Sequence, residues 1–394
     1  MTSLPRRAAG IPGWQAPLAL GLSLSLLSCD NDPTGPISGP GPECEPQLAS
    51  GCWTFLGLED QTITALAETP AGLFAGTQSG GLFRLRPQGD RWEQVGFDDF
   101  FVFALLFVPG PTPRLLVGVE QKVFEGTGLP PVFASTDGGD TWIPWDGGLV
   151  EQFPGIVMSG FSLAIDPGDP ERLYMGGAGN QLRSIDGGRS WEFIDEFGKP
   201  AGGGITNSMV VSPHRDGRVW AGGEGGVFNP FLIRSEDWGD TWELSFPDFS
   251  QLSGDGAVFD VAVDDIDPQR VWIAAPAPGL GVGVFRSDDA GHTWELVLEA
   301  TPVFRVLGNS DELYAAGGTN LRDPPEGSGT GQALSDLGLF RSNDGGSTWS
   351  MLAAPAEAGG ARTAAFDSQG RLLIGTIQID GLQRGGVWRL EPSS

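Results

Sequence analysis

The sequence has few of the residues on which most enzyme active sites depend, with two histidines, two tyrosines and three cysteines among 394 residues. Nucleophilic triads and many zinc sites need a histidine close to its partners. His214 lies in a Ser-Pro-His-Arg turn and His292 lies in a turn that recurs along the chain, so neither is expected to act in catalysis. The acidic stretches 30–32 and 264–267 lack the ligand spacing of a calcium loop. No metal and no cofactor is expected.

Basic residues are also scarce, since 23 lysines and arginines stand against 50 aspartates and glutamates and give a net charge of −27. An acidic surface repels phosphate groups, which argues against nucleic acid and anionic lipid surfaces as partners. Such a surface suits solubility outside the cytoplasm or a basic partner. After residue 28, no apolar run is long enough to span a membrane.

Residues 1–28 are typical of an export signal, with Arg6 and Arg7 before a short apolar stretch from Leu18 to Leu27. The stretch ends in Leu-Leu-Ser followed by Cys29, which resembles the lipobox of a bacterial lipoprotein. On that resemblance Cys29 becomes the N-terminus, carries the lipid and holds the protein on the cell envelope, at the periplasmic face or the cell surface. An ordinary secretory signal with a chance cysteine is the alternative.

Residues 29–50 are rich in Pro, Gly and Asp and cannot build a core, so they are predicted to form an extended tether. Cys44 and Cys52 lie close together in a chain that is predicted to be exported. This spacing favours one disulfide between them, and two free thiols are the alternative.

A repeated segment dominates the remaining residues, 51–394, which contain most of the 62 glycines. Five copies read Ser, any residue, Asp, any, Gly, any, Ser or Thr, Trp, and recur about every 50 residues, as expected for one four-stranded propeller blade. Their tryptophans are Trp142, Trp191, Trp242, Trp294 and Trp349, and their aspartates are Asp137, Asp186, Asp237, Asp289 and Asp344.

Two further copies complete the count. Trp92 keeps the phase of a degenerate sixth copy, and Val387-Trp388-Arg389 repeats the strand that precedes each motif. Because the chain ends soon afterwards, residues 53–56 are predicted to supply the missing outer strand of the last blade. The prediction is an all-β fold, a single seven-bladed propeller of four-stranded blades, closed by its N-terminal strand. Nothing predicts a long helix.

The motif resembles the Asp box, or BNR repeat, of bacterial neuraminidases, xyloglucan hydrolases, sortilin receptors and photosystem II assembly factors. The resemblance implies that the motif is structural and lies on the face away from the ligand site. Tyr174 and Tyr314 share a repeat position with Trp220 and Trp272, so packing is expected of both rather than the nucleophile role of a sialidase tyrosine. Xyloglucan hydrolases use two propellers and a pair of aspartates, whereas one propeller is predicted here.

Eleven arginines recur at two repeat positions, so scaffold roles are expected of them. Arg305 and Arg362 lie outside those positions on the innermost strands of blades 6 and 7, where they are expected to face the same way, and Arg322 and Arg384 lie in loops of the same blades. These four form a candidate site for a carboxylate or another anion, and separate salt bridges are the alternative. Asp260, on the innermost strand of blade 5, is the best single candidate for a carboxylate in the central channel of the predicted ring.

The leading hypothesis is a lipid-anchored, monomeric envelope protein that binds a protein or a glycan through its loop-rich face. A glycoside hydrolase of sialidase or xyloglucanase type is the alternative, and a purely structural envelope protein is a third possibility. A pair of carboxylates on the loop face would favour the hydrolase, and exposed aromatic side chains without such a pair would favour binding.

Overall fold

The computed structural model describes residues 52–122, 128–154, 157–194, 204–225, 229–245, 256–277, 281–299, 303–318, 338–352, 358–378 and 384–392. All of them belong to the compact unit Pro33–Ser394. Cys29 and Cys44, together with Arg322, lie outside the described residues. Cys52 is disulfide-bonded.

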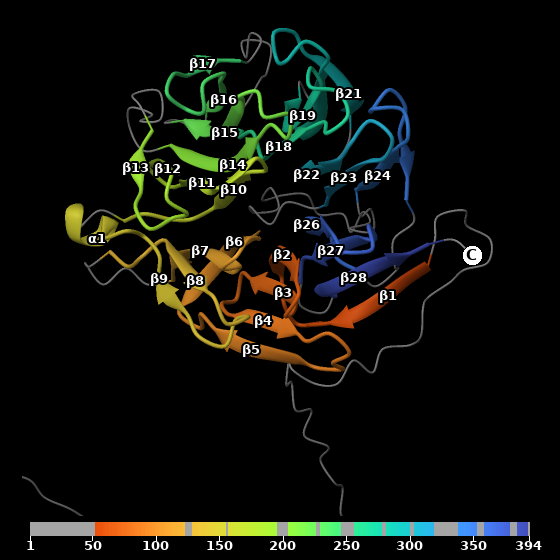
Figure 1. Ribbon diagram of the computed structural model, residues 1–394. Coiled ribbons are helices and arrows are strands. Elements are labelled where there is room, and N and C mark those ends of the chain that lie inside the picture. The colour runs from red at the N-terminus through yellow and green to blue at the C-terminus, as the bar shows by residue number, and fades with distance from the viewer. Residues whose placement is uncertain are drawn as a thin grey trace, which may run out of the picture. The chain divides into compact units, whose positions relative to one another are not determined.

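The described strands form seven antiparallel sheets of four strands each (Figure 1). Blade 1 consists of β2 (Ile63–Thr69), β3 (Gly72–Thr77), β4 (Leu82–Leu85) and β5 (Trp92–Gly96). Blade 2 consists of β6 (Phe100–Val108), β7 (Arg114–Gln121), β8 (Val132–Ser135) and β9 (Ile143–Pro144). Blade 3 consists of β10 (Ser162–Asp166), β11 (Asp169–Gly177), β12 (Asn180–Ser184) and β13 (Glu192–Phe193), and the short helix α1 (Leu149–Gln152) precedes it.

Blades 4 to 7 repeat this order. Blade 4 consists of β14 (Ile205–Val211), β15 (Val219–Gly225), β16 (Asn229–Ser235) and β17 (Glu243–Leu244). Blade 5 consists of β18 (Asp260–Val263), β19 (Val271–Ala277), β20 (Gly281–Ser287) and β21 (Glu295–Glu299). Blade 6 consists of β22 (Val303–Gly308), β23 (Leu313–Gly317), β24 (Leu339–Ser342) and β25 (Ser350–Met351). Blade 7 consists of β26 (Ala361–Phe366), β27 (Leu372–Thr376), β28 (Gly386–Glu391) and β1 (Cys52–Gly57).

The ring closes as predicted. Each innermost strand contacts the innermost strand of the next blade, and β26 of blade 7 contacts β2 of blade 1. The N-terminal strand β1 pairs antiparallel with β28, with Trp53 opposite Leu390 and Phe55 opposite Trp388. In Figure 1 the red strand β1 therefore lies beside the blue strand β28. The seven-bladed propeller is confirmed.

The core lies between the blades rather than at a single centre. Trp220 on β15 packs against blade 5, and Trp272 on β19 packs against blade 6, and both are fully buried. Tyr174 takes the same position on β11, where its hydroxyl donates to the Trp238 carbonyl oxygen at 2.8 Å. Burial raises the pKa of the Tyr174 phenol well above its ordinary value, so Tyr174 packs as predicted and is a poor nucleophile.

The repeated turn is held together by its own side chains. In blade 6, the Ser342 hydroxyl accepts from the Gly346 N–H and donates to the Asp344 carboxylate, both at 2.8 Å. The other oxygen of Asp344 accepts from the Thr348 hydroxyl at 2.6 Å. Gly346 has φ +85°, a conformation that glycine adopts without strain. The same bonds recur around Asp137, Asp186, Asp237 and Asp289.

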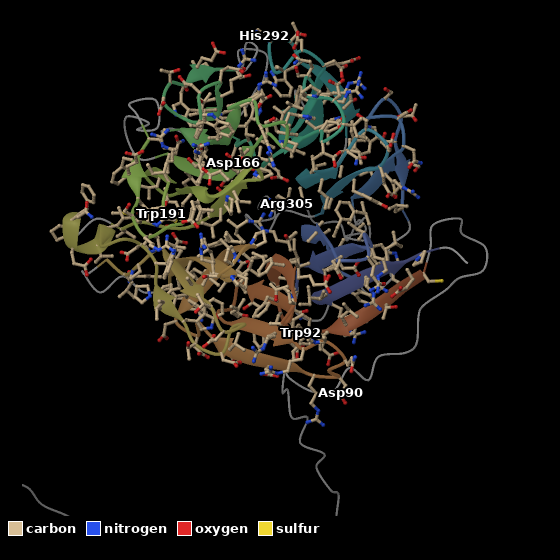
Figure 2. All side chains as sticks on the ribbon, viewed as in Figure 1. Asp90, Trp92, Asp166, Trp191, His292 and Arg305 are labelled. Atoms are coloured by element: carbon tan, nitrogen blue, oxygen red, sulfur yellow. The ribbon has the colours of Figure 1, made fainter. Side chains whose placement is uncertain are left out.

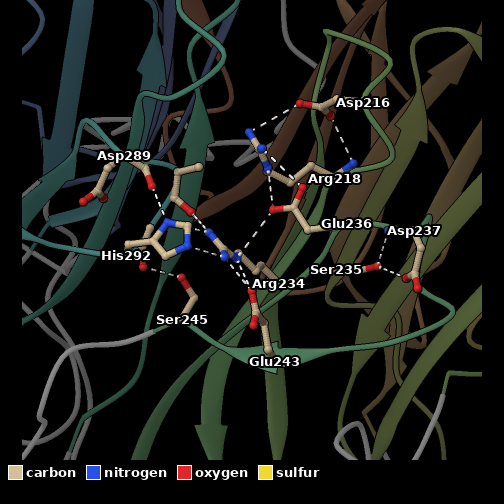
Figure 3. A network of polar contacts seen from close by, with 12 residues as sticks. Asp216, Arg218, Arg234, Ser235, Glu236, Asp237, Glu243, Ser245, Asp289 and His292 are labelled. Carbon is tan, nitrogen blue, oxygen red and sulfur yellow. Dashed lines mark hydrogen bonds and ion pairs between the residues drawn. The ribbon is translucent and has the colours of Figure 1, made fainter.

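The arginine before each turn joins neighbouring blades. Arg84, Arg183 and Arg286 each donate to a backbone carbonyl in the turn of the following blade. Figure 3 shows the equivalent arginine of blade 4, Arg234, between Glu243 of its own blade and His292 of the blade 5 turn. These contacts explain why the arginines recur with the repeat.

Candidate functional site

Strand direction divides the molecule into two faces. The innermost strand of each blade begins at the end where successive blades connect and where the second and third strands are joined, which is called the loop face here. The innermost strand ends on the opposite face, which carries the Ser-x-Asp turns and is called the turn face. His292 lies in such a turn, and the His214 Nε2 atom is 2.8 Å from the Asp264 carbonyl oxygen in the 264–267 turn. Both histidines therefore lie in turns on the turn face, as expected.

The start of each innermost strand contains a bulge, where two consecutive residues oppose a single residue of the second strand. The register shifts in blades 1, 2, 4, 6 and 7 show this directly. In blades 3 and 5, the N–H groups of Phe161 and Phe259, just before the strand, donate to the carbonyl oxygens of the residues that Ser162 and Asp260 oppose. The first residue of the two is called the bulge position and the second the pore position. The bulge positions are Thr64, Phe103, Phe161, Asn207, Phe259, Phe304 and Arg362. The pore positions are Ala65, Ala104, Ser162, Ser208, Asp260, Arg305 and Thr363.

The innermost strands enclose a central cavity of about 270 Å³. Its lining includes residues from all seven blades, among them six of the seven pore-position side chains. Figure 2 places Arg305 near the middle of the ring and Trp92 and His292 farther out. The cavity is therefore the axial channel of the propeller.

Asp260 and Arg305, two predicted site residues, form an ion pair in this channel. Nη1 of Arg305 lies 3.1 Å from Oδ1 of Asp260, and the Arg305 side chain is 37% exposed while that of Asp260 is 7% exposed. Asp260 also accepts from the Ser208 hydroxyl at 2.9 Å and from the Val306 N–H at 3.0 Å. With three donors on its two oxygens, this carboxylate links blades 4, 5 and 6.

The bulge positions form the next layer toward the loop face. Phe103 and Phe161 meet edge to face with ring centroids 4.8 Å apart, and both line the cavity. Phe259 and Phe304 form a second edge-to-face pair at 5.5 Å. The Asn207 amide between the two pairs donates to the Val258 carbonyl oxygen at 3.1 Å. These four phenylalanine rings are called the aromatic mouth here. Sequence reasoning missed them, because a bulge residue carries no distinct sequence pattern.

Of the other predicted arginines, the two that the structure describes, Arg362 and Arg384, do not gather around Arg305. The Arg362 guanidinium lies 4.8 Å from the centroid of the Phe304 ring, and the bulge in β26 aligns Arg362 with Phe304 rather than with Arg305. The two arginines thus occupy different repeat positions, which corrects the expectation of a shared face. Nη2 of Arg384 lies 2.7 Å from a carboxylate oxygen of Glu59, and the guanidinium carbon lies 3.7 Å from the centroid of the Phe55 ring. Arg384 therefore supports the strand β1, which closes the ring.

Glu120, on β7 at the loop-face end of blade 2, is a perturbed carboxyl group. Burial raises the pKa of Glu120 above its ordinary value, and the Ser159 hydroxyl, 3.3 Å away, offsets part of that effect. Glu120 lies opposite Phe101 in the strand register, and the Phe101 ring contacts the Phe103 ring at 6.2 Å. Glu120 is therefore a partly buried acid near the aromatic mouth.

Within the described ranges, no cluster of histidine, cysteine, aspartate or glutamate side chains could hold a metal ion. The Asp264 carboxylate accepts from the backbone N–H groups of Ile266 and Ser310 at 3.0 and 3.3 Å. Asp264 therefore holds its own turn together and links blade 5 to blade 6. Among the same residues, no helix is long and apolar enough to cross a membrane.

Comparison of sequences gives distant relatives. The chain is 26% identical over 322 residues to a xyloglucanase of Paenibacillus sp., covering 71% of this chain and 30% of that protein. It is 26% identical over 339 residues to a xyloglucanase of Hypocrea jecorina, covering 72% of this chain and 37% of that protein. The chain thus spans about a third of the length of these curated relatives. No family model matches.

Comparison of structures supports the fold alone. YCF48 bound to a D1 peptide superposes with a TM-score of 0.55 at 17% identity, covering 85% of this chain and 95% of that one. An ancestral GH74 enzyme superposes with a TM-score of 0.61 at 14% identity, covering 91% of this chain and 51% of that one. The chain is thus similar to propellers of a peptide-bound protein and of glycoside hydrolases.

Proposed function

We propose that this protein is a lipid-anchored envelope protein that binds a protein or a glycan through the loop face of its propeller. The observation that carries the proposal is the state of Asp260. This channel carboxylate already accepts from Ser208, Val306 and Arg305. Because three protein donors already occupy its two oxygens, this carboxylate offers little room for a further hydrogen bond to a reacting group.

The layer above Asp260 supports recognition. The partly exposed rings of Phe103, Phe161 and Phe259 and the guanidinium of Arg362 lie at the loop face, in or directly before the innermost strands. Aromatic rings next to hydrogen-bonding groups suit both sugar rings and peptide side chains. Membrane attachment through Cys29 rests on the lipoprotein-like signal, and the envelope location follows from that attachment.

A glycoside hydrolase is the second candidate, and one observation favours it. A glycosidase needs a carboxyl group that stays protonated near neutral pH to act as a general acid. The raised pKa of Glu120 meets that requirement in direction, and its place near the aromatic mouth meets it in position. The similarity to xyloglucanases adds support.

Screening the full-length protein on a glycan array, together with affinity capture from the native envelope, tests the proposal. We expect retention of a defined glycan or protein, weakened about ten-fold or more in Phe103→Ala. We expect no change in Ile185→Ala, whose 66% exposed side chain lies in a turn-face segment. A parallel assay measures release of reducing ends from xyloglucan. Release that Glu120→Gln abolishes would establish the hydrolase instead, and failure to retain any polymer would reject the binding proposal.

A further inference from the structure

The axial cavity has two chemically different walls. Among the pore-position residues that line the cavity, those of blades 3 to 6 are polar, namely Ser162, Ser208, Asp260 and Arg305, whereas those of blades 1 and 2 are Ala65 and Ala104. Among the described residues that line the cavity, the charged ones are Asp260 and Arg305. The polar groups therefore occupy one arc of the ring, and the two alanines leave space in the other.

Arg305 keeps donor capacity that faces the cavity. A guanidinium has five N–H donors, and Nη1 of Arg305 donates to Asp260. Among the residues that the structure describes, Arg305 makes no other hydrogen bond or ion pair with a protein group. Asp260 fixes the guanidinium in place on one side, and more than a third of the Arg305 side chain remains exposed.

The wall opposite Arg305 is aromatic. In a ring of seven blades, the boundary between blades 2 and 3 lies across the axis from blade 6. Phe103 of blade 2 and Phe161 of blade 3 meet at that boundary, and both rings line the cavity together with Ala104. A guanidinium thus faces an apolar ring pair across the cavity.

We propose that the channel binds a small carboxylic acid with an apolar ring, of the size of phenylacetate. The carboxylate would accept two parallel hydrogen bonds from Arg305, a geometry that arginine favours. The ring would pack against Phe103 and Phe161, where edge-to-face contacts are favourable. A cavity of about 270 Å³ corresponds to roughly nine waters at about 30 Å³ each, which suits a molecule of about ten non-hydrogen atoms.

This inference goes beyond the proposed function, because it concerns a small molecule in the channel rather than a polymer on the loop face. Titration calorimetry and ligand-observed NMR on the full-length protein test it, with phenylacetate as the probe and phenylacetamide as its neutral counterpart. For a ligand of this size we expect a Kd of ~0.1–1 mM for the acid. We expect at least about ten-fold weaker binding of the amide, which lacks the charge for a bidentate pair.

Arg305→Gln should abolish binding of the acid, and Arg305→Lys should retain a reduced affinity. Arg286→Gln is the matched control, because Arg286 pairs with Asp288 and Glu295 at the turn face. Phe103→Leu with Phe161→Leu removes both rings, keeps the side chains apolar and should weaken binding of the acid, which provides a second test should Arg305→Gln fail to fold. Equal binding of acid and amide, binding that survives loss of Arg305, or no binding by the natural protein would overturn the proposal. Polymer retention measured on the same variants keeps the two functions separate.

Discussion

At the scale of single residues, the repeated aspartates act as turn anchors. The hydrogen bond from the Thr348 hydroxyl, followed by those from the Thr348 N–H and the Ser342 hydroxyl, lowers the pKa of Asp344 from 3.8 to about 2. Because the folded-state pKa is lowered, the unfolded chain takes up the proton first as the pH falls. The stabilisation by Asp344 is therefore complete above about pH 4 and is lost between about pH 4 and pH 2.

Asp344→Asn should lower the melting temperature at pH 7 by roughly 1–4 °C, since the amide accepts fewer hydrogen bonds in the turn. It should also flatten the decline of the melting temperature between about pH 4 and pH 2. Differential scanning calorimetry across this range measures both effects. Asp90→Asn is the control, because Asp90 is an exposed residue at the outer edge of blade 1 (Figure 2). If the melting temperature of Asp344→Asn declined between about pH 4 and pH 2 as steeply as that of the natural protein, the assigned role would be contradicted.

At the scale of elements, the sequence period predicted the blades better than the strand ends. In blade 3, the alternation of side chains in the sequence predicts strands at 172–176 and 181–184, which fall within β11 and β12. It also predicts an outer strand at 191–194, which shortens to β13, Glu192–Phe193. Trp191 leaves the ladder because its indole turns toward the previous blade and donates to the Trp145 carbonyl oxygen at 2.9 Å. Such a tertiary contact is invisible to local patterning.

The candidate site was predicted only in part, and the bulges explain the difference. Asp260 and Arg305 could be placed on innermost strands, and the structure brings them together. A bulge adds one residue and shifts the alternation of the strand by one position, and no residue type in the sequence marks where it occurs. Arg362 therefore moved by one position relative to Arg305, and the rings of Phe103 and Phe161 could not be assigned to the channel mouth.

The seams between blades should dominate the stability of each element. Trp92 is 1% exposed, and its indole donates to the Leu56 carbonyl oxygen of β1 at 2.6 Å. Trp92→Ala should lower the free energy of unfolding by about 3–5 kcal/mol, since it creates a cavity and leaves a buried carbonyl unpaired. Urea denaturation measures the change. Ile143→Ala, at a 51% exposed position, should stay within about 0.5 kcal/mol, and equal losses in both variants would refute the seam argument.

At the scale of the whole molecule, β1 makes the ring a closed object. Trp53 and Phe55 are 3% and 7% exposed, and the Phe55 ring lies 4.6 Å from the Trp388 ring. Without this strand, blade 7 would present an open edge in β28. Closure should therefore couple the first and last parts of the propeller into one unfolding unit.

Replacing Trp53 and Phe55 together by alanine should uncouple blade 7 from the other blades. Hydrogen exchange followed by mass spectrometry should show loss of protection first in β26 to β28, while β14 to β16 of blade 4 remain protected. Leu244→Ala, at a 65% exposed position, is the control and should leave both regions unchanged. Uniform loss of protection in all blades of the double variant would show that closure does not act locally.

The bulge in each innermost strand also allows one side chain to vary while the pairing of the strands is kept. A bulge residue has no cross-strand partner of its own, so its side chain can change while the sheet register and the interblade seams remain. Seven such positions surround one opening, and they already carry threonine, asparagine, arginine and four phenylalanines. Thr64 and Phe304 are buried, whereas the other five side chains are partly exposed. One scaffold can therefore acquire different ligand preferences through substitutions at those five positions.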